Sequence, residues 1–371
     1  MKKRLFCLAI SALLLLSGCG RTAEGSTSPP SDDAPSAESE QPYDGPVNPL
    51  TGLPIREAAV NNRPVAIMLN NLKQALPQVG QSQADMIYEV LAEGGITRML
   101  AVYQDASQAG MIGSVRSART YYLELALGHD AIFLHAGGSP DAYAKIKSWG
   151  VTSLDGISGT YGGLTPESSL FWRDADRRKQ NGYEHSMVTT GAAIEATLSN
   201  SSLRLEHADG YQYDMLFSPD GTPAHGTDAT VITVPFSPYK TGVFTYDSES
   251  GLYMVEEYGA PYVDGNTGGQ IGVTNVLILK TSCQLISGDS AGRIAVDLSS
   301  GGTGYYACGG QLIDVVWKKQ SPGGQFIYTD LQGDRISFGA GKTYVNIVPL
   351  TCQVTVNELS AQLRVPSRKN S

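Results

Sequence analysis

Two arginines three residues apart are the side chains best suited to chemistry in this chain. Arg116 and Arg119 lie in GSVRSARTYYLELA (residues 113–126), directly before a run with helical spacing of apolar residues. If Ser117 caps that helix, both arginines lie where free N–H groups and the helix dipole already favour an anion. Positive charge there weakens a helix, and such local conflicts concentrate at functional sites. The pair therefore predicts a phosphate or carboxylate site, and the alternative is a set of structural ion pairs with Glu89, Glu93 or Glu124.

More candidate side chains lie on either side of this pair. Arg173 and Arg177 belong to FWRDADRRKQNGYEHS (residues 171–186) and share one face if that segment is helical. Packed against the first pair and Arg98, they form a clamp for a polyanion; a solvated charged surface is the alternative. His135 ends the apolar run DAIFLHA, the position where open α/β sheets place ligand-binding groups. A structural histidine is the alternative there.

Two carboxylates suggest a metal. Asp85 and Glu89 lie on the same apolar run, and hard cations such as Mg²⁺ prefer carboxylate oxygens. An ion held by them would bridge to the bound anion. We expect no other cofactor. The run HAGGSPDAY lacks the G-x-S-x-G pattern, which argues against a serine hydrolase.

The N-terminus carries export signals. Residues 1–18 combine three early positive charges with a short apolar run and are typical of a signal peptide, too short to span a bilayer. The ending Leu-Ser-Gly-Cys resembles the bacterial lipobox, which implies lipidation of Cys19. Residues 20–47, rich in Ser, Pro and acid, are typical of a flexible spacer. We therefore expect a lipid-anchored protein on the extracytoplasmic face of the membrane.

Composition excludes some partners. Removing residues 1–18 leaves 24 basic and 36 acidic residues, a net charge of −12. An acidic chain without a basic run is a poor candidate for nucleic acid, whose binding depends on neutralising phosphates. Cys283, Cys308 and Cys352 remain beyond Cys19, so at most one intramolecular bridge forms among these three, and Cys283–Cys308 is the first candidate.

Patterning predicts two domains. In residues 48–208, apolar strands alternate with helices, as in residues 63–70, 130–136 and 137–150, which favours an α/β domain with a mixed sheet. Residues 84–105 flank Gly94-Gly95 and predict a hairpin, with a helix over 83–92 as the alternative. Residues 209–355 consist of short β-rich runs between Gly, Asp, Ser and Asn, which predicts a mainly-β domain. Residues 356–371 form a tail.

Several longer motifs resemble a known family. RPVAIMLNN, QADMIYEVLAEGGITRMLAVYQ, IGSVRSART, DAIFLHAGGSPDAY, FWRDADRR and GKTYVNIVP are similar to segments of the YerB-like lipoproteins of Gram-positive bacteria. The resemblance covers most of residues 48–349. It implies a surface lipoprotein built from paired N- and C-terminal domains of unknown function.

Two classes of function remain open. The first is a non-catalytic envelope module that binds an anionic ligand through the arginines. The second is a metal-assisted phosphotransferase or hydrolase, because Asp85 and the arginines occur in an order similar to that of the LytR-CpsA-Psr phosphotransferases. Fold analogy alone does not establish such an activity. The second class requires the carboxylates and arginines to share one cleft, and the sequence leaves the oligomeric state open.

Overall fold

The computed structural model describes residues 45–157, 162–163 and 169–358. The predicted signal peptide, Cys19, most of the spacer and most of the C-terminal tail lie outside these ranges. Within them, no helix has the length and hydropathy needed to cross a bilayer.

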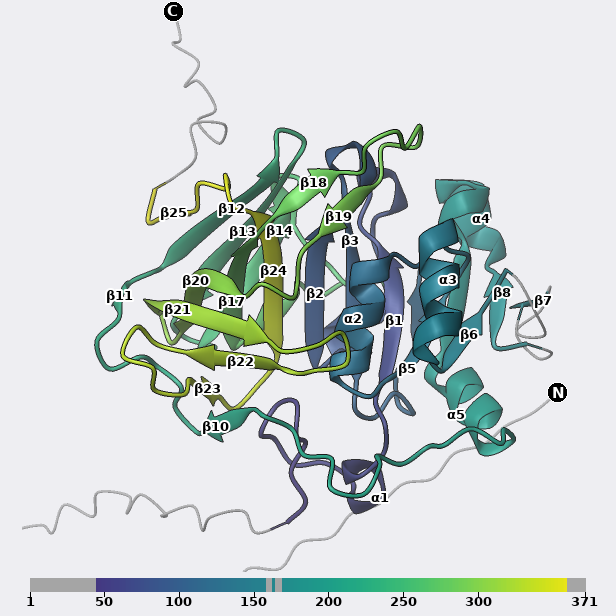
Figure 1. The fold of residues 1–371 in the computed structure, drawn as a ribbon, viewed down its shortest axis with the longest axis horizontal. Helices are drawn as coiled ribbons and strands as arrows, with labels where there is room; N and C mark the ends of the chain where they lie inside the picture. Colours follow the sequence, from purple (N-terminus) through teal and green to yellow (C-terminus); the bar gives the residue numbers. More distant parts are fainter. Residues whose placement is uncertain (1–44, 158–161, 164–168, 359–371) are drawn as a thin grey trace, which may run out of the picture. The chain divides into compact units, whose positions relative to one another are not determined.

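An 11-stranded mixed sheet organises the described chain. Figure 1 shows β24, coloured yellow, between the purple β2 and the green β17. The two predicted regions therefore share this sheet. In spatial order its strands are β11 (Thr227–Asp228), β21 (Gln311–Lys319), β20 (Gly302–Cys308), β17 (Asn275–Thr281), β24 (Thr343–Pro349), β2 (Met86–Leu91), β3 (Thr97–Tyr103), β1 (Val65–Asn70), β5 (Ile132–His135) and β6 (Ser153–Asp155), with β22 (Phe326–Thr329) paired to β21.

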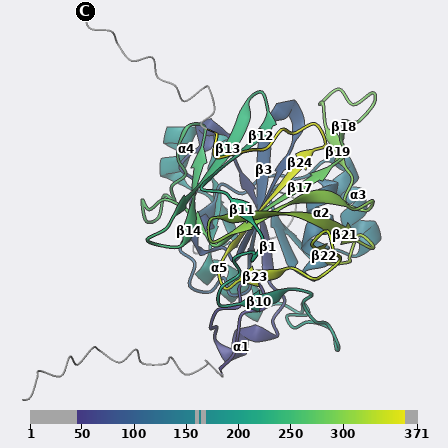
Figure 2. The same ribbon diagram turned by 90° about the vertical axis from the view of Figure 1, so that its left-hand side faces the viewer.

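Both faces of the large sheet are covered. Alternate residues of β1 enter two different cores: Ile67 packs in the core that contains Phe244, and Met68 packs in the core that contains Tyr122. Figure 2 shows β12, β13 and β14 on one side of the large sheet and α2 and α3 on the other. Burial on two faces explains why the strands read as continuous apolar runs rather than as alternating ones.

The remaining elements complete these layers. The helices are α1 (Glu57–Val60), α2 (Thr120–Gly128), α3 (Pro140–Trp149), α4 (Ala175–Asn181) and α5 (Gly191–Ser199). A six-stranded sheet contains β15 (Ala260–Pro261), β14 (Leu252–Glu257), β13 (Lys240–Asp247), β12 (Val231–Ser237), β25 (Thr355–Val356) and β16 (Gly272–Val273). A four-stranded sheet contains β4 (Met111–Gly113), β9 (Met187–Thr190), β8 (Phe171–Arg173) and β7 (Gly162–Gly163), and two small pairs are β10 (Leu216–Ser218) with β23 (Ser337–Gly339) and β18 (Cys283–Leu285) with β19 (Ile294–Val296).

The predicted fold class is confirmed: a mixed sheet with helices comes first and a nearly all-strand region follows. The predicted hairpin is formed by β2 and β3, which pair antiparallel across Gly94, so the alternative helix over 83–92 is wrong. Helix α3 begins after Ser139, whose hydroxyl accepts from Ala142 N, and ends at the left-handed Gly150. The cap predicted for α2 is wrong: its N-cap is Arg119, and the Ser117 hydroxyl donates to Ala136 O instead.

A fully buried ion cluster joins the two regions. The Lys240 ammonium lies 2.8 Å from Glu89 Oε1 and also donates to Glu257 Oε2, and all three side chains are inaccessible to solvent. The hydroxyl of Tyr344 donates to the other oxygen of Glu89 at 2.7 Å. Asn71 and Thr97 donate to Glu89 Oε1 at 2.8 Å and 2.5 Å. Every oxygen of Glu89 is thus occupied by the fold.

The predicted disulfide does not form. Cys283, Cys308 and Cys352 are all free in the structure. Cys283 lies on the small β18–β19 pair, whereas Cys308 ends β20 in the large sheet. All three cysteines are therefore thiols, with Cys308 and Cys352 buried and Cys283 half-buried.

The thiol state gives a direct test. Burial raises the pKa of Cys283 to about 12 and that of Cys352 to about 11, so little of the reactive thiolate is present near neutral pH. We expect slow maleimide labelling of the folded protein and rapid labelling of all three cysteines after unfolding without reductant, counted by mass spectrometry. Protection of Cys283 and Cys308 after unfolding would contradict the free-thiol structure.

Candidate functional site

The predicted arginine pair lies at the carboxyl edge of the parallel strands β1 and β5. Arg116 N donates to Met68 O of β1 at 3.0 Å, and Ala136 N, just after β5, donates to Arg116 O at 3.0 Å. The segment therefore enters the gap where the two strands diverge. Open α/β sheets bind ligands at this edge.

Glu93 joins two of the predicted arginines. Arg98 Nη2 lies 2.9 Å from Glu93 Oε1, and Arg119 hydrogen-bonds both oxygens of the same carboxylate. Burial would raise the pKa of Glu93, but hydrogen bonding to Arg119 and the charge of Arg98 hold it below its usual value. Of the ion pairs considered from the sequence, this one is present.

Arg116 is less well neutralised. Its Nη1 donates to Glu184 O at 2.6 Å, while its Nη2 is 3.8 Å from Glu184 Oε2. The Glu184 side chain is 75 % exposed and that of Arg116 17 %, so solvent competes for this ion pair. Arg116 Nε is buried and has no hydrogen-bond partner among the described residues. Burial lowers the pKa of Arg116, the charges of Arg98, Arg119 and Arg173 lower it further, and the charge of Glu184 opposes them.

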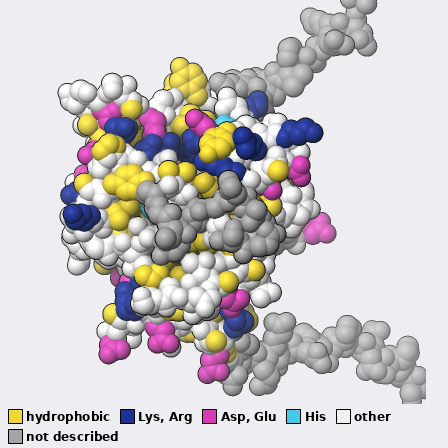
Figure 3. All heavy atoms as spheres, turned by 90° about the vertical axis from the view of Figure 1, so that its right-hand side faces the viewer, with side chains coloured by type: hydrophobic (Ala, Val, Ile, Leu, Met, Phe, Trp, Pro, Cys, Tyr) yellow, Lys and Arg dark blue, Asp and Glu magenta, His cyan; other side chains and the backbone are white. Residues whose placement is uncertain are grey.

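Arg173 and His185 also lie near Arg116. Arg173 donates to Tyr183 O at 2.6 Å and stacks over the Tyr183 ring. The Asn70 amide donates to His185 Nδ1 at 2.9 Å, which leaves Nε2–H of the neutral ring as a donor. Figure 3 views the face that carries α4 and shows Lys and Arg side chains gathered across its upper part, with a His among them. We call Arg98, Arg116, Arg119 and Arg173 the arginine cluster.

Two predicted residues are committed elsewhere. Arg177 donates to the carbonyl oxygens of Ala75, Pro77 and His185. Its guanidinium therefore holds the loop at residues 75–77 against the segment that follows α4. It lies on α4, whereas Arg173 ends β8, so the predicted shared helix face is wrong. His135 is fully buried at the end of β5, bonds Gly137 O through Nδ1, and has a pKa lowered by burial.

The two carboxylates predicted to hold Mg²⁺ are not brought together. They are four residues apart along an extended chain, roughly 13 Å, which exceeds the reach of one ion. Asp85 accepts from Asn48 and from Gln104 N, and Glu89 belongs to the buried ion cluster. Asp85 N bonds Val102 O, four residues along β3 from Arg98, so Asp85 is also roughly 13 Å away from that arginine. Among the residues that the structure describes, no group of three or more His, Cys, Asp or Glu side chains is arranged to bind a metal.

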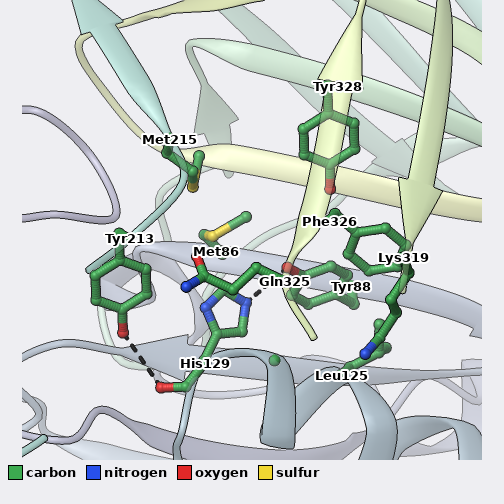
Figure 4. A pocket seen from close by; sticks show the side chains of 11 residues that line it. Met86, Tyr88, Leu125, His129, Tyr213, Met215, Lys319, Gln325, Phe326 and Tyr328 are labelled. Carbon is green, nitrogen blue, oxygen red and sulfur yellow. Dashed lines mark hydrogen bonds between the residues drawn. The ribbon is translucent and has the colours of Figure 1, made fainter. Parts of the chain in front are cut away.

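A separate hollow lies on the α2 side of the large sheet. Figure 4 shows its wall of aromatic and methionine side chains, with the Tyr328 hydroxyl pointing inward. His129 Nε2 lies 2.7 Å from the Tyr88 hydroxyl, and burial lowers the pKa of His129 to about 3. Lys319 donates to three backbone carbonyls at the rim. The free volume is about 20 Å³, room for about one water molecule, so this hollow suits solvent rather than a ligand.

Sequence reasoning missed three partners. The sequence gives no sign that Glu184 pairs with Arg116, or that Lys240 pairs with both Glu89 and Glu257. A basic residue within the apolar run VITVPFSPYKTGVF was the available signal for Lys240, because a buried lysine requires a partner.

Comparisons with known proteins place the chain in a family. Residues 50–204 match the N-terminal domain, and residues 232–345 the C-terminal domain, of the DUF3048 proteins of unknown function. A relative in Bacillus subtilis (strain 168), named "Putative lipoprotein YerB", is 34 % identical over 311 residues, which are 81 % of this chain and 86 % of the relative. The crystal structure of the YerB protein from Bacillus subtilis matches with a TM-score of 0.70 and 31 % identity, over 83 % of this chain and 99 % of that one. The chain therefore belongs to the DUF3048 family, as a YerB-like protein.

Proposed function

We propose that this protein is a lipid-anchored extracytoplasmic lipoprotein that binds a phosphate- or carboxylate-bearing ligand of the cell envelope at the arginine cluster. The observation that carries the proposal is Arg116. It has one exposed, weakly paired carboxylate partner, and a buried N–H with no partner among the described residues. A guanidinium in that state favours an anion.

Local charge supports this proposal. The arginine cluster contains four guanidiniums, and its ion-pair partners are two carboxylates, Glu93 and Glu184. The surplus of two positive charges lies on a chain whose net charge is −9. No side chain caps the N-terminus of α2 beside it, so the first N–H groups of that helix add to the positive potential.

The expected location narrows the range of candidate ligands. The lipobox-like ending at Cys19 and the signal peptide direct the chain to the outer side of the membrane. The name of the YerB relative is consistent with a lipid anchor. Phosphates of polyprenyl carriers and the phosphates or carboxylates of wall polymers share the required chemistry.

Binding without transfer is the function that the geometry favours. A metal-assisted phosphotransferase would need Asp85 or Glu89 beside the arginines, and both are held elsewhere by the contacts described above. A nucleic-acid ligand is disfavoured by the acidic chain.

Substitution of Arg116 tests the proposal. We expect calorimetry of the full-length protein in detergent to detect binding of inorganic pyrophosphate and of a polyprenyl phosphate, weakening as salt is added. Arg116→Gln should reduce affinity by about tenfold or more, because a charge-assisted bidentate contact is lost. Glu184→Gln should raise affinity, since a competing carboxylate is removed.

Arg178→Gln is the matched control, because Arg178 also stacks near Tyr183 but is exposed on α4. It should leave affinity unchanged. Absence of binding by the unmodified protein, or equal binding by the Arg116 variant, would exclude an anion site centred on this residue.

A further inference from the structure

A groove lies at the β11 end of the large sheet, opposite the β6 end. Its walls come from the segment that joins β10 to β11, from β21, and from the turn between β22 and β23. Figure 1 shows β10, β11, β22 and β23 together at its lower left. The groove has a free volume of about 590 Å³. A groove of this size has room for a few residues of an extended peptide.

The outer edge of β21 is open inside this groove. β11 pairs only with the first two residues of β21, and β22 pairs only from Val316 on, so residues 313–315 have no strand partner on that side among the described residues. Leu312 O faces β11, because it accepts from Thr227 Oγ1 at 3.3 Å. Backbone groups of an antiparallel strand alternate between its two neighbours, so the N–H and C=O of Asp314 face the open side. Such an edge can pair with another extended segment.

The lining of the groove is acidic. Arg335 lines it, but Asp214 balances that charge at 2.7 Å. With His225 neutral, the lining then carries a surplus of three negative charges. These belong to carboxylates that have no ion-pair partner among the described residues, namely Asp220, Asp314 and Asp330. An occupant of the groove should therefore be basic.

The C-terminal segment of this chain has the complementary charge. Residues 359–371, LSAQLRVPSRKNS, lie outside the described residues. Their sequence contains no Asp or Glu and three basic residues, Arg364, Arg368 and Lys369. On a chain with a net charge of −9, this segment is locally positive.

The described chain ends beside the groove. Asn357 Nδ2 donates to Asp228 O at 2.8 Å, and Asn357 Oδ1 accepts from Thr230 N at 2.8 Å. Asp228 directly follows Thr227, which lines the groove. Residues 359–371 can extend over at most about 43 Å, so they are long enough to follow the whole groove.

The same segment has the pattern of a strand. Apolar residues at positions 359, 361, 363 and 365 alternate with Ser360, Gln362 and Arg364, and Pro366 follows. Strict alternation over seven residues predicts a half-buried strand, and a proline is suited to its end. The groove offers apolar side chains to cover one face of such a strand, namely Leu312, Ile313, Leu331 and Ile336.

We propose that residues 359–371 bind in this groove and add an extended segment to the open edge of β21. The backbone of the segment hydrogen-bonds to Asp314, its apolar side chains cover Leu331 and Ile336, and its basic side chains pair with the three lining carboxylates. The tail is thus an intramolecular ligand of the C-terminal region. Six strand spacings, roughly 29 Å, separate β21 from β1, so the groove is independent of the arginine cluster.

Zero-length cross-linking of the full-length protein in detergent tests the contact. A carbodiimide joins an ammonium to a carboxylate only where the two touch, and Lys369 is the single lysine of the segment. We expect mass spectrometry to find Lys369 joined to Asp220, Asp314 or Asp330. An equal mixture of ¹⁵N-labelled and unlabelled protein shows whether the link lies within one chain. Absence of a link to any of the three acids, or a link found only between two chains, would contradict the proposal.

A synthetic peptide of residues 359–371 measures the affinity by fluorescence anisotropy. Its host is the full-length protein with its own segment neutralised by Arg364→Gln, Arg368→Gln and Lys369→Gln. Adding Asp314→Asn and Asp330→Asn to this host should weaken binding about fivefold, the effect of two exposed ion pairs. Added salt should weaken binding too. A peptide with the same residues in an order that breaks the alternation should bind several-fold more weakly, because its apolar face is lost.

Two controls complete the design. Asp209→Asn with Glu249→Gln removes two exposed acids elsewhere and should leave the affinity for the peptide unchanged. Arg116→Gln should bind the peptide normally while losing pyrophosphate, which separates this proposal from the anion site. The groove is excluded as the site of this segment if the Asp314 and Asp330 changes weaken binding no more than the control changes do. Equal binding of the reordered peptide would likewise exclude it.

Discussion

Replacing Lys240 by methionine should destabilise the fold by about 3–5 kcal/mol, the usual cost of removing one partner from a buried ion pair. Methionine is similar in volume, so packing is largely kept. The carboxylates of Glu89 and Glu257 would lose their shared cation while remaining fully buried. Urea unfolding followed by tryptophan fluorescence measures the change in the free energy of unfolding.

Neutral replacements of the acids should restore most of that loss. In Lys240→Met with Glu89→Gln and Glu257→Gln, position 89 can still accept from Thr97 and pair with the Tyr344 hydroxyl. Lys318→Met is the matched control and should change stability by less than about 0.5 kcal/mol, as exposed substitutions do. A Lys240 variant as stable as the control would show that the ion cluster contributes little.

Acid should weaken the protein through His129. Burial lowers its pKa to about 3, whereas an unfolded histidine titrates near 6.5. The unfolded chain therefore binds the extra proton first as the pH falls. The free energy of unfolding is unaffected by His129 above pH about 6.5. It falls by roughly 5 kcal/mol as the pH is lowered from there to 3. Unfolding free energies measured between pH 7.5 and 4 would follow this loss.

His129→Gln isolates the effect, since glutamine can keep a hydrogen bond to the Tyr88 hydroxyl but carries no titrating ring. The variant should lose less stability than the unmodified protein, and the difference should reach about 3 kcal/mol near pH 4.5. His225→Gln changes an exposed histidine and should follow the unmodified protein. Parallel curves for all three proteins would exclude His129 as the source of acid sensitivity.

Local signals predicted local structure well. The hairpin across Gly94 follows from its glycines and flanking apolar runs, and α3 from its Ser139 cap and Gly150 stop, since these depend on neighbouring residues. The start of α2 was less predictable. Ser117 has the side chain of a typical N-cap, but its hydroxyl donates to Ala136 O, and the helix begins after Arg119 without a side-chain cap.

Long-range partners had no local signal. The arginines at 98, 116 and 119 were identified by residue type, but only the fold assigns Glu93 to two of them and Glu184 to the third. The metal hypothesis failed for a simpler geometric reason, because four residues of an extended strand separate Asp85 from Glu89 by roughly 13 Å. Lys240 and Tyr344 meet Glu89 across 151 and 255 residues of sequence, which no spacing rule anticipates.

The place of β24 also determines how the chain can be made. It is the last strand of the large sheet in sequence, yet it lies at the centre, between β2 and β17. Because synthesis runs from the N-terminus, β2 and β17 each have an unpaired edge until residues 343–349 emerge. A chain that stopped short of these residues would leave the facing edges of β2 and β17 unpaired and able to pair with other chains, so we expect truncation before β24 to cause aggregation.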